Sequence, residues 1–332
     1  MDFLISGEHI SPIYLATLGF IVGILGGFFG VGGSFIAGPG LFVVGVPMNF
    51  VVGTDLAHIV GKSIVAGRQH LVRGNVDIKL ALIMGAGTII GTEVGAQAIQ
   101  YLKRLREVDI VVGICFIAVL VSISAFMAWE GWVTIKARDK RRQTSNSSTA
   151  IPQVTWVSMS PRFSGYYLLA QKRKRRRGDS PVGGFANRIQ RIKLWPMMKL
   201  AESEIKSVSL WMVLTVGVIG GLFAGFLGGG AGYVRLPLLV YVLGVPTKVA
   251  VGTDLFEIII SATYGTLSHA IKGNVDIMIA LVMHTGAAVG AQIGVVLTGF
   301  FRGPKIRLAF SPLPLIGAAL IVYGLVTGQK MK

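Results

Sequence analysis

The chain has 332 residues, of which 52% are hydrophobic and only 14% are charged. A soluble domain carries about a quarter charged residues, so too little polar surface remains here to cover a water-soluble body. We therefore predict an all-α, polytopic helical membrane protein. The single cysteine, Cys115, excludes an intramolecular disulfide framework. The net charge of +17 would suit a nucleic-acid-binding protein, so its location along the chain has to be considered.

Most of the positive charge lies in one segment. Residues 136–206 contain 17 Lys and Arg against four acidic residues, a net of +13, which leaves +4 for the rest of the chain. The run KRKRRR at 172–177 resembles a nucleic-acid patch. Between apolar segments, attraction to anionic lipid headgroups is the better interpretation, and basic loops stay on the cytoplasmic side. We expect a lipid contact here and no nucleic-acid partner.

Apolar segments occur on both sides of this basic stretch. The first follows an N-terminus, Met1 to Pro12, that has no Lys or Arg, so we expect a retained membrane segment rather than a cleaved signal peptide. A full crossing needs about 20 apolar residues, and the second segment of each half is shorter and interrupted by Gly and Pro, so we predict eight to ten crossings. The segments are 12–28, 31–46, 50–70, 76–101 and 108–130, then 208–227, 230–246, 249–270, 275–300 and 305–326.

The two halves repeat in sequence. GVPMNFVVGTDLAHI (45–59) returns as GVPTKVAVGTDLFEI (244–258), and at an offset of 199 the residues 45–95 match their partners at 21 of 51 positions. We therefore divide the chain into a first transmembrane repeat (1–134), a basic cytoplasmic linker (135–207) and a second transmembrane repeat (208–332). An acidic N-terminus outside and a linker inside favour an inverted pair, whereas the basic clusters at 103–106 and 302–307 favour a parallel one; we predict inversion.

Two glycine strings occupy matching places, GGFFGVGG at 26–33 and GFLGGGAG at 225–232. A nucleotide-binding loop is excluded because no Lys-Ser/Thr follows. Clustered glycines permit a helix to break, and the restarting half-helix presents backbone N–H groups and a positive dipole end to an anion. Close helix packing is the alternative. The candidate substrate-binding residues here are Gly30, Gly32, Gly33, Gly228, Gly229 and Gly230.

The motif Gly-Thr-Asp opens the third segment of each half, at 53–55 and 252–254. Ionisable groups inside a bilayer are costly and mark pathways or proton relays, whereas Thr or Asp beside a break also caps helices. We expect Thr54 and Thr253 to contact substrate. Arg235 either meets the anion directly or reaches to the membrane interface. The candidate proton carriers are Asp55, Asp254, His58 and Glu257, and Lys62 follows within two turns.

Other recurring residues have structural interpretations. Gly87, Gly91 and Gly95 recur as Gly286, Gly290 and Gly294, and spacing by four places each set on one helix face for close packing. GNVD at 74–77 and 273–276 predicts a turn into the fourth segment; His70 and His269 precede these turns near the membrane edge. Glu93 and His284 are secondary relay candidates. No catalytic, metal-binding or cofactor motif is found, so no enzyme is expected.

In their order along the chain, these features resemble the TauE/SafE family of sulfite-exporter-like membrane proteins. The glycine strings are each followed by Pro39 or Pro237, then by GVP, GTDL and GNVD, over roughly 15–130 and 210–326. The resemblance implies a helical transporter in the cytoplasmic membrane that moves sulfite, sulfonates, thiosulfate or related anions using the proton gradient. The basic insert between the halves is longer than the connection common in the family.

The sequence therefore predicts a proton-coupled secondary transporter of a small sulfur-containing anion, multi-pass in the cell membrane, with a homo-oligomer as an open possibility. Two alternatives of other classes remain. The same repeats could line a passive anion channel, or the protein could be a membrane scaffold or sensor that acts through the basic linker.

Overall fold

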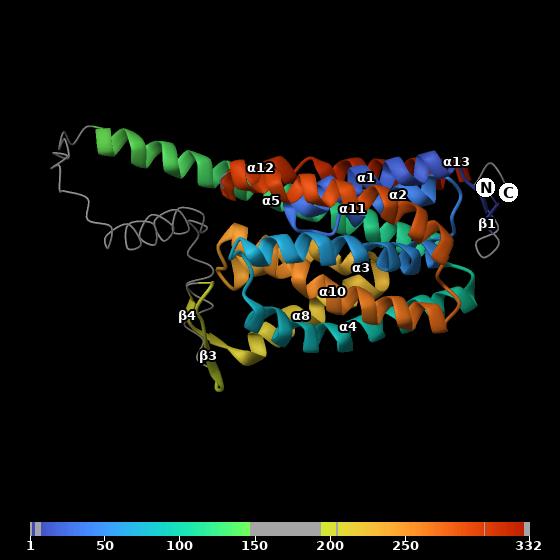
Figure 1. Cartoon of the computed structure of the whole chain (residues 1–332), viewed down its shortest axis with the longest axis horizontal. Coiled ribbons are helices and arrows are strands. Elements are labelled where there is room, and N and C mark those ends of the chain that lie inside the picture. The colour runs from blue at the N-terminus through green and yellow to red at the C-terminus, as the bar shows by residue number, and fades with distance from the viewer. Residues whose placement is uncertain (1, 4–7, 147–193, 204, 302, 329–332) are drawn as a thin grey trace.

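In the computed structural model, long helices lie side by side along the longest dimension of the molecule (Figure 1). The structure describes residues 2–3, 8–146, 194–203, 205–301 and 303–328. Before the linker come α1 (Pro12–Phe29), α2 (Ser34–Val43), α3 (Met48–Val72), α4 (Ile78–Leu105) and α5 (Val108–Asn146). After it come α8 (Leu210–Leu227), the 3₁₀ turn η1 (Gly229–Ala231), α9 (Gly232–Pro237), the π-helical turn η2 (Leu238–Val242), α10 (Thr247–Ile271), α11 (Ile277–Phe300), α12 (Gly303–Phe310) and α13 (Leu313–Gly328). Two short hairpins pair β1 (Asp2–Phe3) with β2 (Glu8–His9) and β3 (Met197–Leu200) with β4 (Ile205–Ser209).

The helices have the length and composition of membrane spans. Seven stretches within the described residues are long and apolar enough to cross a bilayer: α1, α3, α4, residues 108–133 of α5, α8, α11, and α12 with α13 taken together. Large apolar side chains such as Ile90 and Leu281 remain exposed on the outer helices, as lipid-facing residues do. The predicted polytopic helical membrane class is confirmed. The α10 helix has 25 residues, as α3 does, and carries Asp254 and Glu257. It is not among these seven stretches, so the total number of crossings stays a prediction.

The first helix of each half packs against the fourth helix of the other half, α1 on α11 and α4 on α8. Glycines make these contacts close. A Cβ added at Gly91 of α4 would overlap the Val218 carbonyl oxygen of α8, and one at Gly290 of α11 would overlap the Phe20 carbonyl oxygen of α1. Small residues spaced by four let membrane helices approach in this way. The predicted packing role of these glycines is confirmed.

The third helices, α3 and α10, lie side by side in the middle of the molecule and run antiparallel. The hydroxyl of Thr54, near the start of α3, accepts a hydrogen bond of 2.9 Å from the backbone N–H of Asp276, just beyond the end of α10. The hydroxyl of Thr253, near the start of α10, accepts an equal bond from the N–H of Asp77, just beyond the end of α3. Each helix thus begins where the other ends. This course supports the inverted duplication, which stays a prediction from the sequence.

The two GNVD turns form the helix boundaries that the sequence predicts. Gly74 and Gly273 adopt left-handed backbone conformations, with φ of 66° and 68°, directly after α3 and α10. Glycine adopts this conformation without a steric penalty. Asp77 then caps α4 by accepting from the N–H of Leu80, and Asp276 caps α11 in the same way.

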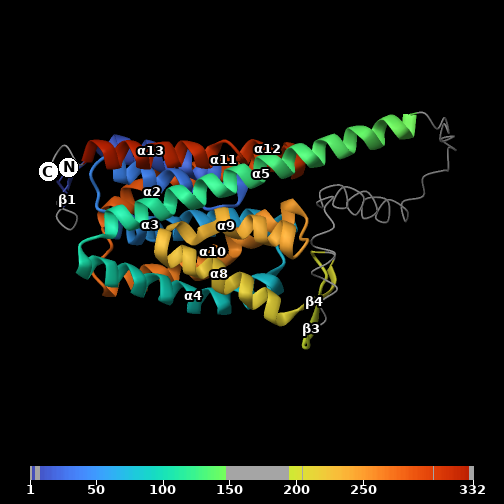
Figure 2. The same cartoon turned by 180° about the vertical axis from the view of Figure 1, so that it is seen from behind.

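The chain that follows the basic linker is attached to one of these caps. Ser203, in the turn of the β3–β4 hairpin, donates from its backbone N–H and from its hydroxyl to Oδ2 of Asp77, at 3.2 and 2.7 Å. The hairpin lies at the end of the molecule opposite the chain termini (Figure 2). The boundary predicted at residue 134 falls inside α5, which continues to Asn146. Most of the predicted linker, including the KRKRRR run, lies outside the described residues.

Candidate functional site

Both glycine strings break a helix, as the sequence predicts. The α1 helix ends at Phe29, and Gly30, Gly32 and Gly33 take φ angles of 77°, 71° and 79° before α2 begins. In the second half, Gly228, Gly229, Gly230 and Ala231 have positive φ angles between α8 and α9. Successive left-handed residues cannot continue a right-handed helix. Each half therefore contains two shorter helices joined by an irregular turn.

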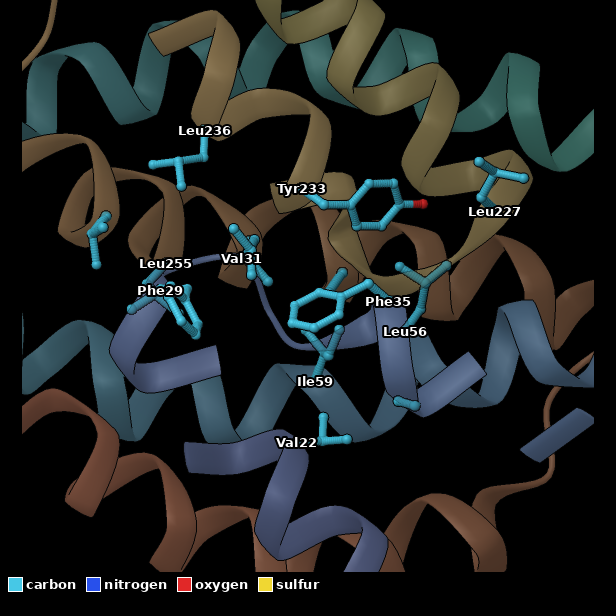
Figure 3. Close-up of a cluster of buried hydrophobic side chains, with 14 of the residues drawn as sticks. Val22, Phe29, Val31, Phe35, Leu56, Ile59, Leu227, Tyr233, Leu236 and Leu255 are labelled. Carbon is cyan, nitrogen blue, oxygen red and sulfur yellow. The ribbon is translucent and has the colours of Figure 1, made fainter. Parts of the chain in front are cut away.

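The two breaks meet in the protein interior. A Cβ added at Gly32 would lie 2.9 Å from the carbonyl oxygen of Gly229, so the two backbones are in contact across the halves. Added at Gly229, it would overlap the Ser34 side chain and lie 3.0 Å from Oδ2 of Asp55. Apolar side chains from both breaks and from α3 surround this crossing, among them Val31, Phe35, Ile59 and Tyr233 (Figure 3). The crossing is thus irregular backbone enclosed by protein, the situation in which a membrane protein tolerates it.

Three ionisable side chains form a row along α3 that starts at this crossing. Nδ1 of His58 lies 3.1 Å from Oδ1 of Asp55, and Nζ of Lys62 lies 3.2 Å from Nε2 of His58. The exposed fractions are 0%, 1% and 2% for Asp55, His58 and Lys62. When Lys62 is an ammonium it can only donate, and then Nε2 of His58 accepts and Nδ1 carries the proton that is donated to Asp55. The three groups form a continuous hydrogen-bonded row across two helical turns.

The second half places an arginine between two carboxylates. Nε of Arg235 donates to Oδ1 of Asp254 at 2.7 Å, and Nη1 pairs with Oε2 of Glu257. All three side chains are fully buried. The Arg235 stem packs against α8, where a Cβ at Gly220 would overlap it. The interpretation that Arg235 reaches to the membrane interface is therefore wrong; it is a central residue of the site.

Several polar atoms at the crossing have no hydrogen-bond partner among the described residues. They belong to side chains that line the two breaks and the charged groups beside them: Ser34 Oγ, Tyr233 Oη, Asp55 Oδ2, Arg235 Nη2, Asp254 Oδ2 and Glu257 Oε1. Buried polar atoms are nearly always paired in folded proteins, so such a concentration requires an explanation. A polar ligand or a proton bound at this place would supply the missing partners.

Some predicted residues lie elsewhere. Thr54 and Thr253 accept bonds from helix starts of the opposite half, which fits the capping alternative; their contact with substrate stays a prediction. Glu93 pairs with Lys272 and Ser268 on the α4–α10 surface, and the His284 ring lies against Gly61. Neither belongs to the buried cluster. Within the described residues, no group of three or more His, Cys, Asp or Glu side chains could hold a metal ion.

Two residues at the crossing, Ser34 and Tyr233, were not expected from the sequence, and Lys62 was placed near the proton carriers without being counted among them. Lys62 follows Asp55 at a spacing of seven, which places both on one helix face, and this signal could have included it. Ser34 and Tyr233 each follow a glycine break, but a serine or a tyrosine at such a position does not by itself indicate a function. Their positions depend on how the two breaks meet, which the local sequence does not specify.

Interrupted helices in both halves, meeting beside buried ionisable residues within a bundle of membrane spans, define the class: a multi-pass membrane transporter. The chain belongs to the TauE/SafE family, because the model of the family described as sulfite exporter TauE/SafE matches residues 15–321. The resemblance inferred from the motifs is thereby confirmed, and the protein is a membrane transporter rather than an enzyme.

Curated relatives of this chain have matching names. It is 25% identical over 325 residues to the probable membrane transporter protein YunE of Bacillus subtilis, an alignment that covers 95% of this chain and 99% of the relative. A probable membrane transporter protein of Xylella fastidiosa is 32% identical over 126 residues, 36% of this chain and 47% of that protein. A similarly named protein of Methanocaldococcus jannaschii is 22% identical over 314 residues, covering 90% of this chain and 91% of the relative. No solved structure matches this chain significantly.

Proposed function

We propose that this protein is a proton-coupled secondary transporter that moves a small sulfur-containing anion, such as sulfite, a sulfonate or thiosulfate, across the cell membrane. The observation that carries the proposal is the meeting of the two glycine breaks beside six buried ionisable side chains: Asp55, His58, Lys62, Arg235, Asp254 and Glu257. Charged groups at this depth are expensive and are retained where solute or protons pass. The sulfur-containing substrate class comes from the family description.

The anion contact that we propose is Arg235, assisted by the backbone of the two breaks. A guanidinium matches the paired oxygens of a sulfonate or sulfite in two parallel hydrogen bonds. Gly30, Gly32 and Gly33 in one break and Gly228, Gly229 and Gly230 in the other leave the backbone open to close approach. The first turn of α2 adds the partial positive charge of a helix start.

The proton-coupling groups that we propose are Asp55, His58, Asp254 and Glu257, and Lys62 extends the row on α3. A hydrogen-bonded row can pass a proton along α3, because each member both accepts and donates in one of its protonation states. The division differs between the halves: the row lies on α3, whereas Arg235 and its two carboxylates belong to α9 and α10. We infer that the two halves have different tasks in the cycle.

Flux into proteoliposomes tests the proposal. Purified protein should transport radiolabelled sulfite or thiosulfate, and an imposed pH gradient should drive accumulation above the outside concentration. Glu93→Gln, which removes a carboxylate on α4 outside the buried cluster, is the matched control and should transport normally. Absence of flux for every sulfur oxyanion and sulfonate tried would contradict the substrate class. Flux that only ever equalises the two concentrations would indicate a passive channel instead.

A further inference from the structure

We propose that the transported anion replaces the carboxylate of Glu257 on the guanidinium of Arg235, and that Glu257 takes up a proton in the same step. Anion and proton would then cross the membrane in the same direction. This inference rests on the proposed transport function. It adds the residue that takes up the proton, the direction in which the proton moves relative to the anion, and the ratio of one proton per anion.

The geometry of Arg235 leads to the replacement. Its Nε is bonded to Asp254 and its Nη1 to Glu257, whereas Nη2 has no hydrogen-bond partner among the described residues. An oxyanion that binds in two parallel bonds needs Nη2 and one of its neighbours. The single N–H of Nε is held by Asp254, and Nη1, which has two N–H groups, contacts Glu257 and, at 3.4 Å, the Ser261 hydroxyl. We therefore infer that a second anion binds the fork where a carboxylate leaves.

Of the two carboxylates, Glu257 is the one free to move. Oδ2 of Asp254 packs against the first residue of α9, 2.6 Å from where a Cβ on Gly232 would be, and its side chain is the shorter of the two. The glutamate has one more rotatable bond, and apart from Arg235 it is held by hydroxyl groups: Ser261 donates to Oε2 at 3.4 Å, and Thr88 also hydrogen-bonds the carboxylate. Its Oε1 has no partner among the described residues, so a proton placed there displaces no existing hydrogen bond.

The charge of the cluster makes the proton necessary. The titratable groups that face the crossing are Asp55, His58 and Lys62 from α3, Tyr233 and Arg235 from α9, and Asp254 and Glu257 from α10; α8 contributes only Gly220 at Arg235. If His58 and Tyr233 are taken as neutral and every other group is counted in its charged form, three carboxylates face two cations, a formal excess of one negative charge. An additional anion, in surroundings that exclude water, adds repulsion that is unscreened. Protonation of Glu257 removes one negative charge as the anion brings one.

Calorimetry on the purified full-length protein tests the linkage. The probe is methanesulfonate, which has no proton to exchange near neutral pH, and titrations in buffers of different ionisation enthalpy give the protons taken up per anion bound. We expect about one proton per anion and an affinity that falls about tenfold per pH unit on the alkaline side. Glu257→Gln should bind the anion with little proton uptake and little pH dependence, whereas Glu93→Gln should behave as the unmodified protein.

Flux in the unmodified protein gives a second test that needs no variant. With a pH gradient imposed on proteoliposomes, cotransport accumulates methanesulfonate on the alkaline side, whereas exchange against protons accumulates it on the acidic side. Binding or transport without proton uptake, or accumulation on the acidic side, overturns this inference and leaves anion transport standing. Unaltered proton uptake in Glu257→Gln overturns the assignment of the residue. If none of methanesulfonate, sulfite and thiosulfate binds, the proposed function fails as well.

Discussion

Nε2 of His269 lies 2.9 Å from the carbonyl oxygen of Gly225, two residues before α8 ends. In the first half, Nε2 of His70 lies 3.3 Å from the carbonyl oxygen of Gly27, two residues before α1 ends. The last carbonyls of a helix have no partner within the helix. The two histidines, which are fully buried, supply that partner where each helix breaks.

Replacing either histidine should therefore loosen a break. We expect His269→Ala to destabilise the protein by roughly 1–3 kcal/mol, because a buried carbonyl loses its donor. His70→Ala should have a smaller effect, because the Thr298 hydroxyl also lies 3.4 Å from the Gly27 carbonyl oxygen. Glutamine, which retains an N–H donor, should recover part of the loss at either position. Thermal unfolding in detergent measures the effect, with the exposed hydroxyl variant Ser122→Ala as control. Equal stability of the alanine and glutamine variants would exclude the hydrogen bond as the cause.

The glycine contacts of α4 with α8 and of α11 with α1 predict a steep dependence of folding on side-chain size. Gly91→Leu and Gly290→Leu should abolish folded yield, since even a Cβ at these positions overlaps a backbone carbonyl of the facing helix. Gly91→Ala should already cost on the order of 1–3 kcal/mol by overpacking. Gly299→Ala on α11 is the matched control, because nothing lies within 4 Å of its Cβ position. Fluorescence-detected size exclusion reports the folded yield, and a well-folded Gly290→Leu variant would refute the close contact.

The features predictable from the sequence are those that local chemistry decides. The clustered glycines in each apolar run predict that the helix is interrupted, at Gly30 after α1 and at Gly228 after α8, because no other residue adopts positive φ as easily. Spacing by four placed Gly91 and its neighbours on one face, and Asp after Gly-Asn specified the cap of α4. Each of these conclusions depends on a few residues that are adjacent along the chain.

The rest depends on how the two halves meet. Arg235 reaches Asp254 and Glu257 only because the chain reverses through α9 and η2 before α10 begins, and no periodicity in the sequence encodes that approach. The hydrogen bond that Thr54 accepts from the N–H of Asp276, 222 residues away, likewise could not be predicted from the local sequence. The hydrogen bonds of Ser203 with Asp77 join the end of the linker to the N-terminal cap of α4, and no sequence motif predicts this contact.

The contact of Ser203 with Asp77 predicts a mechanical link between the linker and the membrane region. Ser203→Ala should remove one charge-assisted hydrogen bond and destabilise the hairpin by roughly 1–2 kcal/mol. Asp77→Ala should have a larger effect, because it also removes the α4 cap. Limited proteolysis within 197–209 measures hairpin opening. The exposed hydroxyl variant Thr285→Ala should leave cleavage unchanged, and unchanged cleavage in Ser203→Ala would contradict the link.

The row on α3 predicts a separation of proton movement from anion movement. Lys62→Met should reduce pH-driven flux by about tenfold or more, since breaking a buried relay hydrogen bond costs roughly 1–3 kcal/mol. Exchange of labelled for unlabelled anion at equal pH, which needs no net proton movement, should be affected much less. Both rates are measured in the same proteoliposomes, with Glu93→Gln as control. A parallel loss of both rates would place Lys62 in anion binding instead of the proton row.

The pairing of Arg235 with two carboxylates predicts a stability effect that can be reversed by a second substitution. Arg235→Gln leaves Asp254 and Glu257 buried beside each other without a cation, and we expect a loss of roughly 3–5 kcal/mol. Glu257→Gln alone leaves a one-to-one pair of Arg235 with Asp254 and should be tolerated. In the double variant, the repulsion between the carboxylates is gone, so the loss should be smaller than in Arg235→Gln alone. Thermal unfolding of the four proteins gives the coupling between the two positions. Strictly additive losses would mean that the two side chains do not interact, and the anion would then have no carboxylate to displace.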